Sequence, residues 1–135
     1  MFEDILLFVY GSLLSGLKHH EQMRGARLLG MSSLTDYHLV LYKEAYPALV
    51  PGTTADPAHF ARVAGELYVV SPEHLSRLDV FEECPTLYQR KSVRLTSGDV
   101  AQAYTITPTQ AHGYPVILGD FRAHLATQPA DEPKS

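Results

Sequence analysis

The sequence predicts an α+β fold: a small, mixed, mostly antiparallel and barrel-like β-sheet of about six strands with two or three flanking helices. Three observations support this prediction. Apolar and β-branched runs of strand length recur along the chain. Most connections between them are too short for a crossover helix, which favours antiparallel pairing. Helical patterns do not alternate strictly with the strands, as they would in a doubly wound fold.

Length and composition indicate one domain. With 135 residues, of which 45% are hydrophobic and 19% charged, the chain has the composition of an ordinary globular protein with a real core. We expect this single domain to span residues 1–127. The remaining segment, Gln128 to Ser135, is rich in proline, alanine and charge and is expected to be a disordered tail.

Charge and hydropathy exclude several function classes. The net charge of −4 and the lack of a lysine and arginine stripe argue against nucleic-acid and anionic-membrane partners. Neither a basic leader nor an apolar stretch of about 18 residues is visible, so no export or membrane insertion is expected. The single cysteine, Cys84, agrees with a reducing compartment. We therefore expect a cytoplasmic protein, acting as a monomer.

The first half of the chain holds most of the expected strands. Ile5–Tyr10 is a continuous apolar run that ends at Gly11, as in a strand buried on both faces. A short helix is expected over Lys18–Met23. The further strands are expected over Ala26–Leu34, Tyr37–Tyr42 and Ala64–Val70. Tyr46–Gly52 is expected to be irregular, because its prolines lack N–H donors, and Thr53–Phe60 is expected to be a loop.

The second half combines a helix and a hairpin. A helix is expected over Pro72–Glu83, followed by an alternating strand over Tyr88–Thr96. The turn at residues 97–99 then leads into a returning strand over Val100–Thr107. Pro108–Pro115 is expected to be irregular, and a closing helix is expected over Leu118–Ala126.

The helix contains a carboxylate on its apolar face. Ser71 followed by Pro72 is a good helix start, because the hydroxyl caps free N–H groups and the proline needs no N–H in the first turn. At about 100° per residue, Glu82 projects towards the same side as Leu75 and Leu78. Glu83 is turned about 100° away, towards the edge of that face.

Two interpretations of Glu82 remain open from the residues alone. The first is a structural ion pair with Arg90 or Lys91 of the following strand. The second is a general base, because partial burial disfavours the charged form and raises the pKa of a carboxyl group towards neutrality.

The other candidates are weaker. The turn Tyr10-Gly11-Ser12-Leu13 after the first strand offers consecutive N–H groups that could bind a carboxylate or an oxyanion, although most such triplets are simple turns. Cys84 lacks a glycine-rich elbow, and Ser12 lacks the Gly-x-Ser-x-Gly pattern, so neither has a nucleophile's surroundings. The seven histidines show no metal-ligand spacing, and no cofactor fingerprint is present, so neither a metal nor a cofactor is expected.

Five short motifs together resemble a known family. They are Phe8-Val9-Tyr10-Gly11-Ser12-Leu13, Tyr46-Pro47-Ala48, Gly65-Glu66-Leu67-Tyr68, Leu78-Asp79-x-x-Glu82 and Tyr88-x-Arg90. Their order and spacing are similar to those of the gamma-glutamylcyclotransferase-like superfamily. The stretch from Asp79 to Arg90 looks especially like gamma-glutamylamine cyclotransferase and its small bacterial relatives, and Gly119-Asp120-Phe121 is similar to a segment near their carboxyl end.

The resemblance implies a function. It implies a small barrel-like fold, a gamma-glutamyl substrate bound by the main chain of Tyr10, Gly11, Ser12 and Leu13, and Glu82 as the catalytic acid/base, without cofactor or metal. The sequence departs from the family at two places. Glu83 stands where relatives commonly carry glycine or a small polar residue, and a second carboxylate beside the base is expected to perturb its pKa or to narrow the pocket. An asparagine common after the first loop is missing, with His19-His20 in its region, and this departure concerns substrate choice more than chemistry.

The expected reaction is a cyclisation by a cofactor-independent acyltransferase or lyase. The α-amine of a gamma-glutamyl group attacks its own γ-carbonyl and releases 5-oxoproline and a free amine or amino acid. Tyr10, Tyr88 and Tyr104 either place hydroxyls or ring walls in the pocket or pack in the core. Arg90 pairs either with the substrate α-carboxylate or with Asp79. The alternatives are a non-catalytic binding module for a gamma-glutamyl-like ligand, and a hydrolase that uses Cys84.

Overall fold

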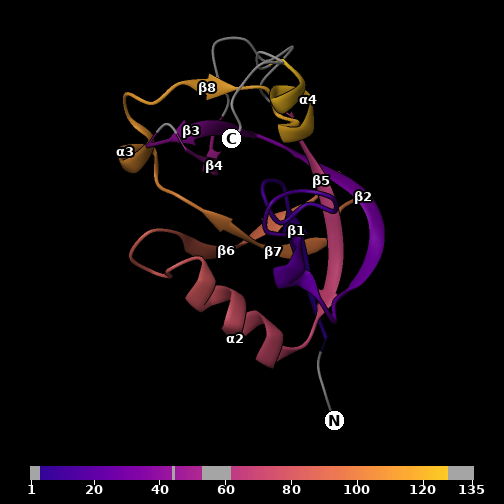
Figure 1. The fold of residues 1–135 in the computed structure, drawn as a ribbon. Coiled ribbons are helices and arrows are strands. Elements are labelled where there is room, and N and C mark those ends of the chain that lie inside the picture. The colour runs from indigo at the N-terminus through magenta and orange to yellow at the C-terminus, as the bar shows by residue number, and fades with distance from the viewer. Residues whose placement is uncertain (1–3, 44, 53–61, 128–135) are drawn as a thin grey trace.

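The computed structural model describes residues 4–43, 45–52 and 62–127 (Figure 1). The predicted loop over Thr53–Phe60 and the predicted tail from Gln128 to Ser135 lie outside the described residues. The elements are, in chain order, β1 (Ile5–Val9), the 3-10 helix η1 (His20–Met23), β2 (Arg27–Thr35), β3 (Tyr37–Tyr42), β4 (Tyr46–Pro51), β5 (Arg62–Val70), α2 (Pro72–Phe81), β6 (Gln89–Arg94), β7 (Val100–Thr105), α3 (Pro108–Ala111), β8 (Val116–Ile117) and α4 (Phe121–Ala126).

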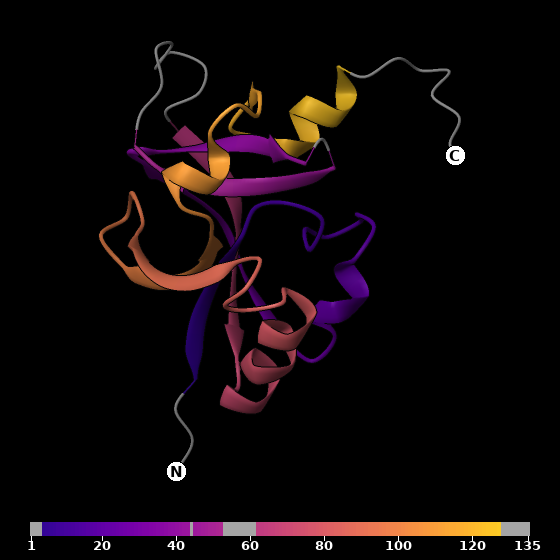
Figure 2. The same ribbon diagram turned by 90° about the vertical axis from the view of Figure 1, so that its left-hand side faces the viewer.

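The strands of the described residues form one curled sheet of eight strands (Figures 1 and 2). The order is β2-β5-β1-β7-β4-β3-β8, and β6 forms a hairpin with β7. Only the β1–β7 and β4–β7 pairs are parallel. The predicted α+β class, with a mostly antiparallel and barrel-like sheet, is therefore confirmed.

The prediction that Tyr46–Gly52 is irregular is wrong. Residues 46–51 form β4, which pairs with β3 along its whole length. Pro47, Leu49 and Pro51 are alternate residues, so their backbone nitrogens face the same side of the strand. The N–H of Leu49 donates to the hydroxyl of Tyr10 (3.3 Å) and not to β3. The two prolines therefore stand at positions where the β3–β4 ladder needs no donor.

Two further short elements were not predicted. Within the segment expected to be irregular, residues 108–111 form α3, which begins with a capping box between Thr107 and Gln110. Val116 and Ile117 form β8 and pair with β3. A strand of two residues shows no periodicity in a sequence, and only its long-range pairing defines it. The predicted helix over Leu118–Ala126 begins at Phe121, because Asp120 caps it through the N–H of Ala123 (3.2 Å).

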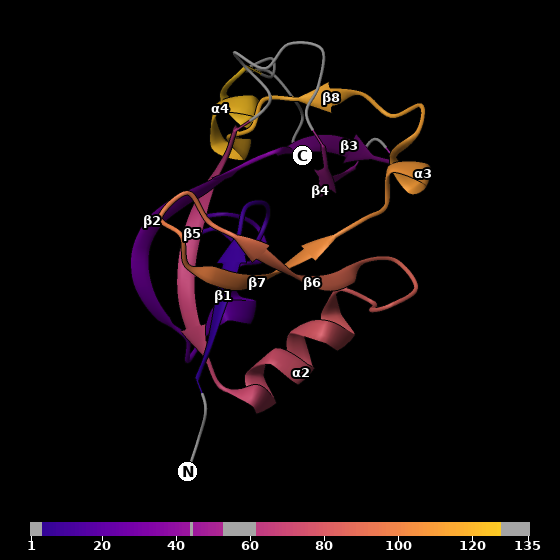
Figure 3. The same ribbon diagram turned by 180° about the vertical axis from the view of Figure 1, so that it is seen from behind.

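Helix α2 lies beside the β6–β7 hairpin (Figure 3) and buries Leu75 and Leu78 in the core. As predicted, Ser71 caps its start, because its Oγ accepts a hydrogen bond from the N–H of His74 (3.0 Å). The helix ends at Phe81, two residues before the predicted end. Among the described residues, no helix is both long and apolar enough to cross a bilayer.

The end of α2 has a specific geometry. Glu82 is the C-cap, and Glu83 has a φ of 57°, in the left-handed region. The N–H of Glu83 donates to the carbonyl of Val80 (3.0 Å), and the N–H of Cys84 donates to the carbonyl of Asp79 (3.0 Å). These two bonds define a Schellman motif, which stops the helix and turns the chain towards β6.

Candidate active site

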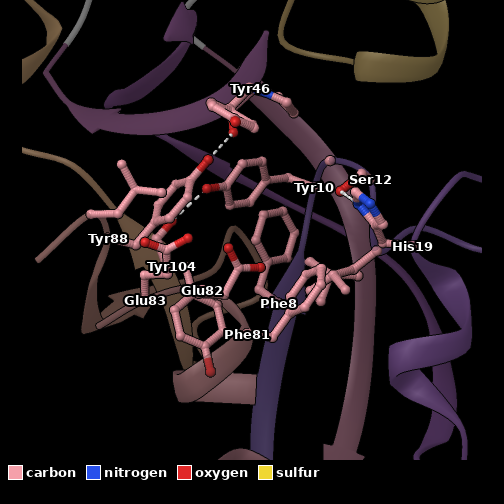
Figure 4. Close-up of a pocket in the computed structure, with 15 residues that line it drawn as sticks. Phe8, Tyr10, Ser12, His19, Tyr46, Phe81, Glu82, Glu83, Tyr88 and Tyr104 are labelled. Carbon is pink, nitrogen blue, oxygen red and sulfur yellow. Dashed lines mark hydrogen bonds between the residues drawn. The ribbon is translucent and has the colours of Figure 1, made fainter. Parts of the chain in front are cut away.

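A cavity of about 230 Å³ lies where the end of β1, the start of β4 and the end of α2 meet. The first strand and the loop after it form one wall, and the end of α2 and the start of β6 form the opposite wall (Figure 4). The residues that line it are Phe8, Val9, Tyr10, Gly11, Ser12, Leu13, His19, Tyr46, Pro47, Phe81, Glu82, Glu83, Leu87, Tyr88 and Tyr104. Six of the seven predicted site residues therefore line this one cavity, and Arg90 is not among the lining residues.

Glu82 places its carboxylate among the aromatic rings of this cavity (Figure 4). Its backbone N–H completes the last turn of α2 by donating to the carbonyl of Leu78 (2.8 Å). Within the described part of the chain, its carboxylate makes neither a hydrogen bond nor an ion pair. Burial raises the pKa of Glu82 to about 7, because desolvation disfavours the charged form.

The ion-pair interpretation of Glu82 is not supported by the geometry. The guanidinium of Arg90 binds Asp79 instead, with its Nε 2.9 Å from Oδ1 and its Nη2 3.1 Å from Oδ2. Its Nη1 donates to the side chain of Gln102 (2.9 Å). Asp79 also accepts a hydrogen bond from the hydroxyl of Tyr104 (2.7 Å). Of the two partners that the sequence left open for Arg90, the structure shows Asp79.

The loop after β1 contributes Gly11, Ser12 and Leu13 to the lining of the cavity. The carbonyl of Gly11 accepts from the N–H of Leu14 (3.0 Å), and the carbonyl of Ser12 accepts from the N–H of His19 (2.9 Å), so the chain folds back on itself. Within the described residues, no hydrogen bond uses the N–H groups of Gly11, Ser12 or Leu13. A Cβ added to Gly11 would lie 2.7 Å from Cγ of Pro47, so the loop and β4 are in close contact.

Three of the four tyrosines that line the cavity have hydroxyls that are bound by other groups of the protein. Tyr10 donates to the carbonyl of Tyr104 (2.5 Å), and Tyr88 donates to the carbonyl of Pro47 (2.9 Å). Burial raises the pKa of both phenols, so they remain protonated donors. Together with Tyr104, which binds Asp79, they form walls of the cavity and hold β1, β4 and β7 in place around it.

A second buried glutamate, Glu66 on β5, is a useful contrast. It is 3% exposed and accepts hydrogen bonds from Ser15 N–H (2.9 Å), Ser15 Oγ (2.5 Å), Tyr68 Oη (3.0 Å) and Arg122 Nη2 (3.1 Å). Burial raises its pKa, but these hydrogen bonds outweigh that effect and lower the pKa below its ordinary value. Glu66 thus anchors the loop that lines the cavity, whereas Glu82 has no such partners.

His19 is a cavity residue whose position the sequence did not predict. Its Nδ1 lies 2.9 Å from the hydroxyl oxygen of Ser12, and its ring packs edge-on against Phe81, with centroids 5.2 Å apart. The only signal in the sequence was the place of His19 in the loop where relatives have asparagine. Cys84 is not among the residues that line the cavity, and burial raises the pKa of its thiol to about 11. Among the described residues, no group of three metal-ligating side chains is close enough to hold an ion.

A small barrel-like domain whose cavity contains a carboxylate with a raised pKa, and with no ion-pair partner among the described residues, has the features of a small-molecule acid/base enzyme. Comparison with known proteins makes this class specific. The family model described as gamma-glutamyl cyclotransferase, AIG2-like matches residues 7–123. The chain belongs to this family, and the prediction that it is an enzyme of the gamma-glutamylcyclotransferase type is confirmed.

Individual relatives agree with the family. A gamma-glutamylaminecyclotransferase from Homo sapiens is 38% identical over 97 residues, covering 67% of this chain and 61% of the human protein. Gamma-glutamylaminecyclotransferase A from Danio rerio is 34% identical over 113 residues, covering 74% of this chain and 66% of the fish protein. The crystal structure of an AIG2-like protein from Mus musculus superposes with a TM-score of 0.71 at 26% identity, covering 98% of both chains.

Proposed function

We propose that this chain is a gamma-glutamyl cyclotransferase in which Glu82 is the general base and acid. The α-amino nitrogen of the substrate attacks the γ-carbonyl carbon, a carbon–nitrogen bond closes the five-membered lactam, and the bond to the leaving nitrogen breaks. The products are 5-oxoproline and a free amine or amino acid. The observation that supports this proposal most directly is the unpaired Glu82 carboxylate in the cavity, with its pKa raised to about 7.

The proton balance fits a single carboxylate. The substrate α-amine is an ammonium group in solution, and it must lose a proton before it can attack. Glu82 accepts that proton and then donates it to the departing nitrogen. The attacking nitrogen loses a second proton as it becomes the lactam N–H, and Glu82, again a carboxylate, passes this proton to the free amine, which leaves as an ammonium ion. General catalysis of this kind contributes roughly 10²–10⁴-fold, and it is most effective when the catalytic pKa is near the working pH.

The loop after β1 is suited to the developing oxyanion. As the α-amine attacks, the γ-carbonyl oxygen becomes negatively charged and needs hydrogen-bond donors. Gly11, Ser12 and Leu13 line the cavity, and their N–H groups have no partner among the described residues. One donor of this kind contributes about 3–4 kcal/mol to transition-state stabilisation.

The cavity also favours cyclisation by holding the glutamyl chain in a folded conformation. Aromatic rings and the Pro47 ring surround the carboxylate of Glu82, and a volume of about 230 Å³ suits a small zwitterion. Holding the amine and the carbonyl of one molecule close together lowers the entropic part of the activation barrier, because the chain has already lost its freedom when it binds. No covalent enzyme intermediate is needed.

Product analysis tests the proposal. The protein is incubated with a panel of gamma-glutamyl amides, and 5-oxoproline and glutamate are measured separately. Formation of 5-oxoproline with an equal amount of free amine is expected. Glutamate in its place would show hydrolysis, and binding without either product would show a binding module; both results would contradict the cyclotransferase.

A further inference from the structure

The charged side chains that line the cavity are mainly acidic. Among the residues that line it, Glu82 and Glu83 carry carboxylates, and there is no lysine or arginine. His19 is the only lining residue that can carry a positive charge. Figure 4 shows the two glutamates on one side of the cavity and His19 with Ser12 on the other side.

The two glutamates differ in depth. Glu82 is partly buried, whereas Glu83 is exposed and still lines the cavity, so Glu83 stands at its rim. The raised pKa of Glu82 comes from burial, and Glu83 does not contribute to it. Glu83 therefore does not act by tuning the base.

The turn at the end of α2 does not require a glutamate. With a φ of 57°, Glu83 occupies the C′ position of the Schellman motif, which glycine adopts without steric cost. Within the described part of the chain, its carboxylate forms no hydrogen bond or ion pair. Neither the backbone nor a side-chain contact thus requires a charged residue there, and the carboxylate at the rim is available to a ligand.

We propose that Glu83 selects gamma-glutamyl amides whose leaving amine carries a second, positively charged amino group. This inference rests on the proposed function. The reacting α-amine must reach Glu82 inside the cavity, so the leaving group extends towards the rim, where Glu83 lies. A carboxylate at that place attracts an ammonium group a few bonds beyond the scissile nitrogen and repels the carboxylate of a leaving amino acid.

The expected effect is modest because the rim is exposed. Water and salt weaken a single exposed ion pair, which supports a preference of roughly fivefold in kcat/KM for a cationic over a neutral leaving group. The preference should decrease as the ionic strength rises. An anionic leaving group should be disfavoured by a similar factor.

Matched substrates test this inference. The gamma-glutamyl amide of 1,4-diaminobutane carries an ammonium group where that of n-pentylamine carries a methyl group, and the two are otherwise equal in length. The ratio of their kcat/KM values for 5-oxoproline release is measured for the natural chain and for Glu83→Gln. We expect a ratio of about five that falls to nearly one in Glu83→Gln.

A control variant distinguishes the effect of a carboxylate at the rim from the effect of the net charge of the protein. Glu73 is exposed in the first turn of α2, about 14 Å along the helix from Glu82. Glu73→Gln changes the net charge of the protein as Glu83→Gln does, and it should keep the ratio of the natural chain. A ratio near one in the natural chain, or an equal fall in both variants, would overturn the inference.

A binding measurement tests the role of Glu83 independently of the proposed reaction. In Glu82→Gln the only carboxylate left among the lining residues is that of Glu83, and calorimetric titration with the two intact amides needs no turnover. Tighter binding of the cationic amide to Glu82→Gln, lost in the double variant Glu82→Gln/Glu83→Gln, would support the inference even if no 5-oxoproline forms and the proposed reaction fails. Equal binding of the two amides to Glu82→Gln would contradict it.

Discussion

The guanidinium of Arg90 is bound to the carboxylate of Asp79 by two hydrogen bonds of 2.9 and 3.1 Å, and Glu82, three residues after Asp79, has no cation. The first basic residue after the end of α2 is therefore already neutralised outside the cavity. A carboxylate that is buried beside a free cation would be stabilised in its charged form. The pairing of Arg90 with Asp79 thus leaves Glu82 able to take up a proton near neutral pH.

Replacing Glu82 by glutamine should abolish turnover. The amide has nearly the same shape as the carboxyl group but cannot accept a proton, so kcat should fall by at least about 10²-fold while the substrate still binds. Single-turnover assays of 5-oxoproline, with circular dichroism as a control for folding, check this result. A variant that keeps more than about a tenth of the activity would remove Glu82 from the role of base.

The pH dependence of kcat/KM should contain an acid limb near pH 7. The pKa of Glu82 is raised to about 7, so below this pH the group is protonated and cannot accept the substrate proton. Between pH 6 and 5 the rate should fall about tenfold per unit.

Two variants identify the group responsible for this limb. The other titratable side chains of the cavity are Glu83, His19 and four tyrosines. Because burial alone raises the pKa of Glu82, Glu83→Gln should leave the midpoint in place. If His19→Asn moved the midpoint by a full unit or more, the limb would belong to the imidazole and not to Glu82.

Local sequence signals predicted the helix that leads to Glu82 well. Ser71 and Pro72 mark its start, and the spacing of Leu75, Leu78 and Glu82 indicates which face carries the carboxylate. These signals are reliable because capping and helical periodicity act within a few residues. The end of the helix was placed two residues late, because a left-handed Glu83 gives no signal that a glycine would have given.

Long-range contacts were not predictable in the same way. The prolines of β4 suggested an irregular segment, because the sequence does not tell which side of a strand its partner occupies. Glu66 and Ser15, which hold the cavity loop, are separated by 51 residues in the sequence, and Arg122 is further still from Ser15. Only the topology of the sheet brings such groups together.

Gly11→Ala should damage both packing and catalysis. The new Cβ would lie 2.7 Å from Cγ of Pro47, whose carbonyl also holds Tyr88, so the loop or β4 must move. Overpacking of this kind costs about 1–3 kcal/mol of stability. A shift of the N–H donors should also lower kcat about tenfold or more. Thermal unfolding and steady-state kinetics of the same variant check both effects, and unchanged kcat would exclude the loop from oxyanion binding.

Cys84→Ala should be close to neutral for the rate. The thiol lies outside the residues that line the cavity, and its pKa of about 11 leaves almost no thiolate at pH 7. Alkylation of the thiol and the alanine variant are each compared with the untreated natural chain. A large loss of activity in the alanine variant, with thermal unfolding unchanged, would restore the hydrolase that uses Cys84.

Glu82 should also make the stability of the protein depend on pH in an unusual direction. Its pKa is near 4.5 in the unfolded chain and about 7 in the folded one, so between these values the folded state binds more protons. The free energy of unfolding must then decrease as the pH rises from about 4.5 to 7, because the desolvated carboxylate becomes charged. Glu82→Gln removes this loss and should be more stable than the natural chain by up to about 3 kcal/mol above pH 7. Denaturant unfolding of both proteins at pH 4.5 and pH 8 measures the difference, which should be much smaller at the lower pH. An equal difference at both pH values would mean that the carboxyl group of Glu82 does not titrate with a raised pKa in the folded protein, and the base near neutrality would have to be another group.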